Sequence, residues 1–383
     1  MKEKLLHIGS YILVAMLATV VTLTMVHLQL GLKPSKLEEL EVLIQEKFIG
    51  EADFVKMEDA AAEAMLNATG DRWSAYIPAS EYDLYLQQSE NVYVGVGMTI
   101  QSTEDGSGFL VIDVVPDGPA AEAGIQIQDL LTRVGETDIR SMTMEEVGNL
   151  VKGEEGTTVS LTVFRQGTHE TLFVQRRKVK TPVATYEMLD NNIGLVTIEN
   201  FDDRCTEESI AAIETLLEQG AEKLIFDVRF NPGGFASELV ELLDYLLPEG
   251  ELFRTIRYDG EEYVDTSDAD CLEIPMAVLV NGSSYSAAEF FAAALQEYEA
   301  AVVVGEPTVG KGYCQTTYQL SDGSAVSLSI GKYFTPKGIS LEAEGITPDV
   351  LELVEEELAA QIYYGILPPE EDPHIQAAIR VLK

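Results

Sequence analysis

The chain has 383 residues, of which 46% are hydrophobic, which predicts two folded domains with extensions rather than a disordered chain. Asp and Glu (65) outnumber Lys and Arg (25), and the net charge of -40 excludes nucleic acid as an expected partner, because its phosphates would be repelled. The three cysteines lie far apart and show no metal-ligand spacing such as C-x-x-C, so neither a bound metal nor a disulfide framework is expected, and at most one pair could form a disulfide.

The N-terminal segment is apolar. Residues 5–32 contain no Asp, Glu, Lys or Arg, and a run of this length can cross a hydrocarbon core of about 30 Å. The run ends in "MVHLQLGLKPS", which lacks the small-residue pattern of a cleavage site, although lysines on both sides weaken the orientation signal. We therefore expect residues 1–33 to form a short cytoplasmic tail and a transmembrane signal anchor. Cleavage of this segment is the alternative.

Residues 34–90 are expected to be helical, because apolar residues recur every three or four positions in "LEELEVLIQEKF" and "EDAAAEAMLNATG". Trp73, which follows them, is interpreted as a packing anchor. Short strands are expected across residues 91–180, where "TVSLTVFRQGTHETLFVQR" has the alternation of a hairpin around a glycine turn. A glycine loop, "YVGVGM", precedes these strands, and "TMEEVGNLVKG" predicts an amphipathic helix among them.

This order of elements resembles a PDZ domain, a small antiparallel barrel capped by two helices. In PDZ domains the amides of the glycine loop capture a C-terminal carboxylate, and an exposed strand edge accepts the peptide as an added strand. The resemblance implies that a substrate tail contacts Val94, Gly95, Val96, Gly97 and Met98.

Strands and helices alternate across residues 181–354, which predicts an α/β core with a largely parallel sheet. Two of the strands, in "KLIFDVRF" and "PMAVLVNG", continue through glycine- or serine-rich turns into helices. The C-terminal tail, residues 355–383, contains a further amphipathic helix in "DPHIQAAIRVL".

The turn "GSSYSAAEFF" places a candidate nucleophile, Ser286, at the last position before a helix. A helix N-terminus presents unpaired amides and a partial positive charge, which suit a developing oxyanion. A serine at this position is also a good helix cap, and the turn alone does not decide between the two roles. None of the four histidines lies in a sequence context typical of a catalytic base.

Lys311, between two glycines in "VGEPTVGKGYCQ", is the candidate base. An amine enclosed in an apolar cleft loses its charge readily, and the neutral amine can deprotonate a serine hydroxyl. Gln315 is expected to orient this amine by a hydrogen bond without adding charge. These residues predict a serine–lysine hydrolase that needs no metal or organic cofactor.

Four motifs make the chain similar to the carboxyl-terminal processing proteases, also called tail-specific proteases, of peptidase family S41. "DVRFNPGG" resembles the family's D-L-R-N-N-P-G-G, and "VLVNGSSYSAAE" its V-L-V-N-x-x-S-A-S-A-S-E. "VGEPTVGKGYCQ" resembles V-G-E-x-T-x-G-K-G-x-V-Q, and "YFTPKGISLEAEGITPDV" resembles Y-x-T-P-x-G-x-S-I-x-x-x-G-I-x-P-D. The resemblance implies an α/β, crotonase-like (ClpP/crotonase-type) serine protease core with an inserted PDZ domain and helical N- and C-terminal extensions.

The resemblance also implies a nucleophile, a base, a residue that orients the base, and two amide donors for the oxyanion: Ser286, Lys311, Gln315, and the amides of Ala287 and Gly233. Lys152 stands where relatives often carry an arginine linked to gating, and lysine keeps the charge but loses the planar fork. Phe230 and Tyr285 depart from the family pattern and are expected to reshape the substrate cleft without removing a catalytic group.

The sequence therefore predicts a membrane-anchored serine endopeptidase whose catalytic domain lies outside the cytoplasm, in a bacterial cell envelope. Its expected partners are proteins or peptides with free C-termini, the membrane through the N-terminal helix, and a second copy in a homodimer formed by the helical ends. Two alternatives stay open. A latent PDZ scaffold would bind C-terminal peptides without cleaving them, and a crotonase-like acyl-CoA enzyme would share the core and the paired oxyanion donors.

Overall fold

The computed structural model describes residues 14–22, 34–103 and 105–382. No helix within these ranges is both long and apolar enough to span a membrane. The predicted transmembrane segment within residues 1–33 falls largely outside the described residues; only residues 14–22 of it are described, and they are helical.

The described residues divide into two compact units, one up to Met65 and the other from Leu66 onward. In the first, α2 (Lys36–Lys47) begins at a capping box in which Ser35 and Glu38 each accept a hydrogen bond from the other's backbone amide. No residue of α2 or of the following helix, α3 (Phe54–Asn67), is buried. Apolar side chains of both helices instead line an open groove of about 300 Å³.

The second unit contains a small antiparallel sheet with the strand order β3-β4-β5-β7-β8. Its strands, with β6 paired to β5, are β3 (Met98–Ser102), β4 (Phe109–Val114), β5 (Leu130–Val134), β6 (Thr137–Asp138), β7 (Thr158–Arg165) and β8 (Thr168–Gln175). The short helices α5 (Pro119–Glu122) and α6 (Met144–Val151) accompany this sheet, and β2 (Val92–Gly95) pairs with β9 (Arg177–Lys180). Leu131, Val147 and Leu161 are completely buried in its core.

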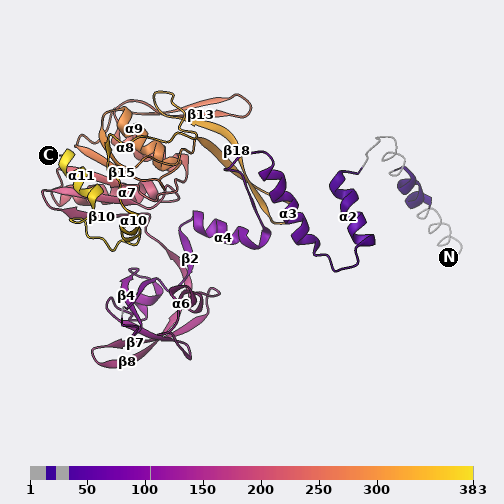
Figure 1. The fold of residues 1–383 in the computed structure, drawn as a ribbon, viewed down its shortest axis with the longest axis horizontal. Coiled ribbons are helices and arrows are strands. Elements are labelled where there is room, and N and C mark those ends of the chain that lie inside the picture. The colour runs from indigo at the N-terminus through magenta and orange to yellow at the C-terminus, as the bar shows by residue number, and fades with distance from the viewer. Residues whose placement is uncertain (1–13, 23–33, 104, 383) are drawn as a thin grey trace, which may run out of the picture. The chain divides into compact units, whose positions relative to one another are not determined.

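A six-stranded sheet carries the core of the chain and has the order β10-β11-β12-β15-β16-β19. Figure 1 labels two of these strands, β10 and β15. The strands are β10 (Ala184–Leu189), β11 (Ile193–Ile198), β12 (Lys223–Asp227), β15 (Met276–Val280), β16 (Ala301–Gly305) and β19 (Val350–Leu351). All neighbours are parallel except β10 and β11. This agrees with the largely parallel sheet that the alternation of strands and helices predicts.

Both faces of this sheet are covered, which explains why strands such as "MAVLV" are continuously apolar. One face packs in a core with α7 (Cys205–Glu218), α8 (Ala236–Leu246) and α9 (Ala287–Glu297). The other face packs against α11 (Pro373–Val381), whose Ile375 and Ala378 join Ile225 in a second core. The apolar face of α11 is therefore occupied by the sheet and is not free for the dimer interface expected of the C-terminal tail.

A second, antiparallel sheet has the order β1-β18-β13-β14, with β17 also paired to β18. The strands are β1 (Ala75–Ile77), β13 (Gly250–Arg257), β14 (Glu262–Ser267), β17 (Tyr313–Gln319) and β18 (Ala325–Phe334). Two further helices are α4 (Ala79–Ser89) and α10 (Glu356–Tyr363). β18 pairs with both β1, which follows Trp73 closely, and β17, which begins just after Lys311. The stretch around Trp73 and the stretch around Lys311 therefore belong to neighbouring parts of one sheet.

Candidate active site

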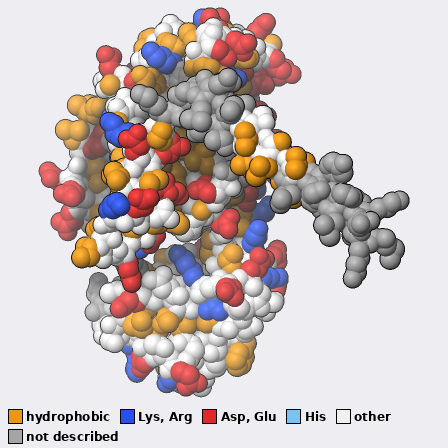
Figure 2. Space-filling view, turned by 90° about the vertical axis from the view of Figure 1, so that its right-hand side faces the viewer, with side chains coloured by type: hydrophobic (Ala, Val, Ile, Leu, Met, Phe, Trp, Pro, Cys, Tyr) orange, Lys and Arg blue, Asp and Glu red, His pale blue; other side chains and the backbone are white. Residues whose placement is uncertain are grey.

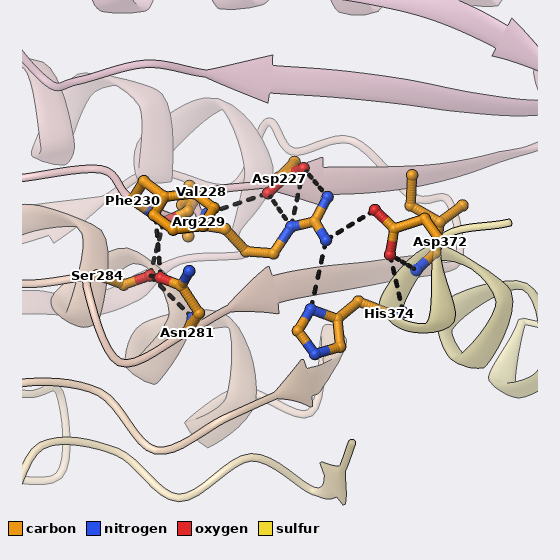
Figure 3. A network of polar contacts seen from close by, with 9 residues as sticks. Asp227, Val228, Arg229, Phe230, Asn281, Ser284, Asp372 and His374 are labelled. Carbon is orange, nitrogen blue, oxygen red and sulfur yellow. Dashed lines mark hydrogen bonds and ion pairs between the residues drawn. The ribbon is translucent and has the colours of Figure 1, made fainter. Parts of the chain in front are cut away.

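Two loops that follow neighbouring parallel strands form the candidate site. Because β12 and β15 pair in parallel, the loops at their carboxyl ends lie side by side. The Phe230 amide donates to Asn281 Oδ1 at 2.9 Å, and Ser284 Oγ donates to the Val228 carbonyl at 2.7 Å (Figure 3). Ser284 therefore braces the two loops.

Arg229, in the first of these loops, is almost completely buried and is held by a polar network (Figure 3). Its guanidinium pairs with Asp227 at the end of β12 and with Asp372 at the N-cap of α11. His374 Nδ1 lies 3.3 Å from Arg229 Nη1, and His374 Nε2 lies 2.9 Å from the Glu352 carbonyl oxygen. The network thus anchors the start of the loop to the C-terminal helix.

Ser286 has a strained backbone, with φ 59° and ψ -126°, immediately before α9. Non-glycine residues rarely adopt positive φ, and such strain is concentrated at functional sites. The residue is buried, with 7% of its surface exposed. The amide of the next residue, Ala287, opens the helix and has no acceptor in the described part of the chain, so it is free to donate to a ligand.

Gly233 passes close to this turn. A Cβ atom on Gly233 would lie 2.7 Å from Ser286 Cβ and 2.8 Å from the Ala287 nitrogen, so only glycine permits the approach. The Gly233 amide donates to Asn231 Oδ1 at 2.8 Å. Of the two expected oxyanion donors, Ala287 is therefore free and Gly233 is engaged by Asn231.

Glu289, completely buried in the first turn of α9, connects the serine turn to the lysine turn. One of its carboxylate oxygens accepts hydrogen bonds from the backbone amides of Ser286 and Lys311, both at 2.9 Å. The other accepts from the Gly310 amide at 2.7 Å and from Thr308 Oγ1. One carboxylate thus fixes the backbone of the candidate nucleophile relative to that of the candidate base.

Lys311 is half-buried beneath two aromatic rings. Its Nζ atom lies 5.2 Å from the centroid of Trp73 and 5.5 Å from that of Tyr285, and the two rings stack with centroids 6.4 Å apart. Burial lowers the pKa of Lys311 below its usual value near 10.5. Three carboxylates oppose this shift: Asp71, Glu289 and Glu342. The net direction favours the neutral amine that a base requires.

The stretch around Trp73 also holds the lysine turn from outside. Arg72 Nη2 donates to the Gly310 carbonyl at 2.8 Å, while Trp73 Nε1 donates to the Glu342 carboxylate at 3.2 Å. Glu342 in turn accepts from the Gly312 amide at 2.8 Å. Sequence reasoning placed Trp73 as a packing residue and missed this contact, because no local pattern connects residues so far apart in the chain.

A cavity of about 460 Å³ contains Ser286, Lys311, Gln315 and Gly233 among its lining residues. The Gln315 amide nitrogen donates to Ser329 Oγ at 3.3 Å, and among the described residues no hydrogen bond joins Gln315 to Lys311. Tyr285 also lines the cavity, as its departure from the family pattern suggested.

Phe230, by contrast, is not among the residues that line this cavity. Its ring packs edge-on against Tyr363 of α10, with centroids 5.2 Å apart. Within the described residues, no group of three or more His, Cys, Asp or Glu side chains is placed to hold a metal ion.

The glycine loop at residues 94–98 leads from β2 into β3. The Val96 carbonyl accepts from the Ala120 amide at 2.7 Å, and Gly97 has φ 74°. Lys152 is the exposed C-cap of α6 and is not among the residues that line the cavity of Ser286 and Lys311. The side chain that binds the carbonyls at this helix end is Arg176, which the sequence reading did not single out.

Comparisons with known proteins identify the family. The model of peptidase family S41 matches residues 192–351, and that of PDZ domains matches residues 110–165. The carboxy-terminal processing protease CtpA of Bacillus subtilis is 30% identical over 321 residues, which cover 83% of this chain and 68% of CtpA. The chain belongs to peptidase family S41.

Further similarities agree with S41 membership. A protein of Staphylococcus haemolyticus, described as a CtpA-like serine protease, is 29% identical over 355 residues, or 90% of this chain and 71% of that protein. A solved structure described as an S41 protease from Bacteroides fragilis is 18% identical, covers 80% of this chain and 90% of its own, and has a TM-score of 0.51, which supports the fold. This S41 chain, with its PDZ domain, is a serine-type peptidase related to the carboxy-terminal processing proteases.

Proposed function

We propose that this S41 peptidase is an endopeptidase with Ser286 as the nucleophile, Lys311 as the base, and a PDZ domain that recognises the C-terminal tail of its substrates. The observation that carries the proposal is that Ser286 and Lys311 line one cavity while one buried carboxylate, that of Glu289, binds the backbone of both. Glu289 is a positioning residue, since its hydrogen bonds come from backbone amides and the Thr308 hydroxyl and not from the reacting atoms.

The proposed reaction begins when Ser286 Oγ attacks the scissile carbonyl carbon and passes its proton to the neutral amine of Lys311. The Ala287 amide is available for the oxyanion that forms. The Gly233 amide joins it once Asn231 releases that amide. Lys311 then donates the proton to the departing amine, which leaves an acyl-enzyme on Ser286. Water, deprotonated by Lys311, hydrolyses the acyl-enzyme and restores the serine.

We assign to Gln315 the task of orienting the lysine amine when substrate binds. Its hydrogen bond to Ser329 uses the amide nitrogen, which leaves the carbonyl oxygen to accept from Lys311. In the PDZ domain, we expect the amides of residues 94–98 to bind the terminal carboxylate of the tail, and Lys152 to act in gating. The mostly parallel sheet, with helices on both faces, supports a crotonase-type core.

The wider organisation is also proposed. Residues 1–33 would form a cytoplasmic tail and signal anchor, followed by a helical region (34–90), the PDZ domain (91–180), the protease core (181–354) and the helical tail (355–383). The catalytic part would lie outside the cytoplasm, in a bacterial cell envelope. The exposed apolar side chains of α2 and α3 support a homodimer formed through the N-terminal helices.

The test uses the full-length chain in detergent with β-casein as an unfolded substrate, and cleavage is followed by mass spectrometry. Ser286→Ala and Lys311→Ala should abolish cleavage, while the same changes at two exposed positions, Ser283→Ala and Lys337→Ala, should leave it unchanged. Cleavage that persists in Ser286→Ala would refute the assignment. A peptide with an amidated C-terminus should be cleaved more slowly than the free acid, and equal rates would rule out tail recognition.

A further inference from the structure

We infer that Asp202 makes the catalytic cavity select substrates with a basic side chain next to the scissile bond. The inference deepens the proposed function, on which it rests, by naming a substrate class for the same cavity. Neither the family motifs nor the Ser286–Lys311 chemistry assigns a role to this residue.

The backbone holds Asp202 beside the candidate oxyanion loop. Its neighbour Phe201 bridges to Gly234, donating its amide to the Gly233 carbonyl at 2.8 Å and accepting from the Phe235 amide at 2.7 Å. Gly234 is in direct backbone contact with Phe201, since a Cβ on Gly234 would lie 2.2 Å from the Phe201 carbonyl carbon. Asp202 is thus a fixed part of the cavity wall that also holds Ser286 and Lys311.

The Asp202 carboxylate has no partner among the described residues. Its backbone amide donates to Asn200 Oδ1 at 3.1 Å, but no hydrogen-bond donor or cation reaches its side-chain oxygens. Asp202 is half-buried, whereas fully buried aspartates among the described residues are paired, as Asp227 is with Arg229 and Asp129 with Arg165. A carboxylate that is partly withdrawn from water and has no partner is costly, so a cationic ligand group that supplies hydrogen bonds gains free energy there.

The charges around Asp202 favour a cationic ligand as well. Among the residues that line the cavity, only Asp202 and Lys311 are ionisable as acid and base near neutral pH, and Lys311 must be neutral to act as the base. The whole chain carries a net charge of -40, and Asp and Glu side chains are spread over the visible face of the molecule (Figure 2). This field draws basic peptide segments toward the cavity.

The Asp202 carboxyl group loses its proton within the pH range of the activity test described below. Burial, aided by the nearby Glu238, raises the pKa of Asp202 to about 7. A carboxyl is negative above its pKa, so a preference for a basic side chain should appear as the pH rises through about 7. The titratable groups around Asp202 are Tyr85 of α4, Cys205 of α7, Glu238 of α8, Tyr285 before α9, Lys311, and Tyr313 and Tyr333 of the second sheet.

The test compares peptides that differ only by lysine or norleucine, placed in turn at each position flanking the scissile bond. The ratio of their kcat/KM values with the full-length enzyme, from pH 5.5 to 8.5, cancels the titration of Lys311. At the position that faces Asp202, we expect lysine to be favoured about tenfold at pH 8.5, the effect of one charge-assisted hydrogen bond, and scarcely at all at pH 5.5. Asp202→Asn should give a flat ratio, and Asp203→Asn, which removes the neighbouring exposed charge, should behave as the wild type.

Binding of the same peptides to Ser286→Ala, measured by calorimetry, provides a readout that does not depend on turnover or on Asp202 variants. Equal rates and equal affinities for the two peptides at every position, or a lysine preference that survives in Asp202→Asn, would overturn the inference. Cleavage by Ser286→Ala would instead refute the proposed catalytic site, while the affinity ratio would still judge the role of Asp202.

Discussion

Replacement of Glu289 by glutamine should uncouple the proposed nucleophile, Ser286, from the proposed base, Lys311, without changing either of them. The carboxylate accepts four hydrogen bonds, from three backbone amides and one hydroxyl, and it is completely buried. The amide nitrogen of glutamine cannot accept, so one of the two pairs of bonds is lost and its donors are left unsatisfied. At about 1.5–3 kcal/mol for each bond to a charged group, the loss is about 3–6 kcal/mol.

Two assays measure the effect of losing these hydrogen bonds. Urea denaturation should show lower stability for Glu289→Gln, and kcat/KM on an unfolded protein should fall by at least about a hundredfold, because small displacements of catalytic groups cost this much. The matched control is Glu297→Gln at the other end of α9, where a half-exposed carboxylate accepts from Thr335 and from the Lys337 amide. A Glu289→Gln variant that matches this control in both assays would refute the bracing role.

Three further predictions follow from the same geometry. Because burial lowers the pKa of Lys311, kcat/KM should rise with pH with an apparent pKa below 10.5, and a rise centred at 10.5 or above would contradict this cause. Trp73→Ala should admit water to the Lys311 amine and raise that apparent pKa, while Trp73→Phe, which keeps an aromatic ring in place, should raise it less. An unchanged pH profile in Trp73→Ala would contradict the shielding of Lys311 by Trp73. Gly234→Ala should lower the free energy of unfolding in urea by about 3 kcal/mol or more, because it forces both an unfavourable φ and a clash with Phe201. Gly220→Ala, where φ is positive but the space around the Cβ is open, should lower it by about 1 kcal/mol. Equal losses would show that the close backbone approach at Gly234 is unimportant.

Local sequence patterns predict most of the core, because the hydrophobic residues of each of its helices and strands follow a single regular spacing. The apolar spacing of α9 and the uniform hydrophobicity of β15 and β16 identify these elements and their order. The motifs also place Ser286 before a helix and Lys311 after a strand. The common cavity that holds both residues is consistent with the site read from the motifs.

The antiparallel sheet that contains β1, β13, β14, β17 and β18, and the contacts that depend on it, could not be predicted from local patterns. Strands β13 and β17 contain bulges, between Glu251 and Phe253 and between Cys314 and Gln315, which interrupt the alternation that marks a strand. The contact of Trp73 with the lysine turn depends on pairing between β1 and β18, which only the folded chain establishes. The same holds for the Asn231 side chain that occupies the Gly233 amide, and for the sheet that covers α11.

The central claim, that Lys311 activates Ser286, is tested most directly by reaction with a serine-directed fluorophosphonate, since this needs no substrate recognition. Peptide mapping by mass spectrometry should locate the adduct on Ser286, with fluoride displaced by Oγ. The labelling rate should increase with pH as Lys311 loses its proton, and Lys311→Ala should slow it by about a hundredfold or more, the contribution of a general base. Labelling of a different serine, or of Ser286 in Lys311→Ala at the wild-type rate, would contradict the serine–lysine mechanism.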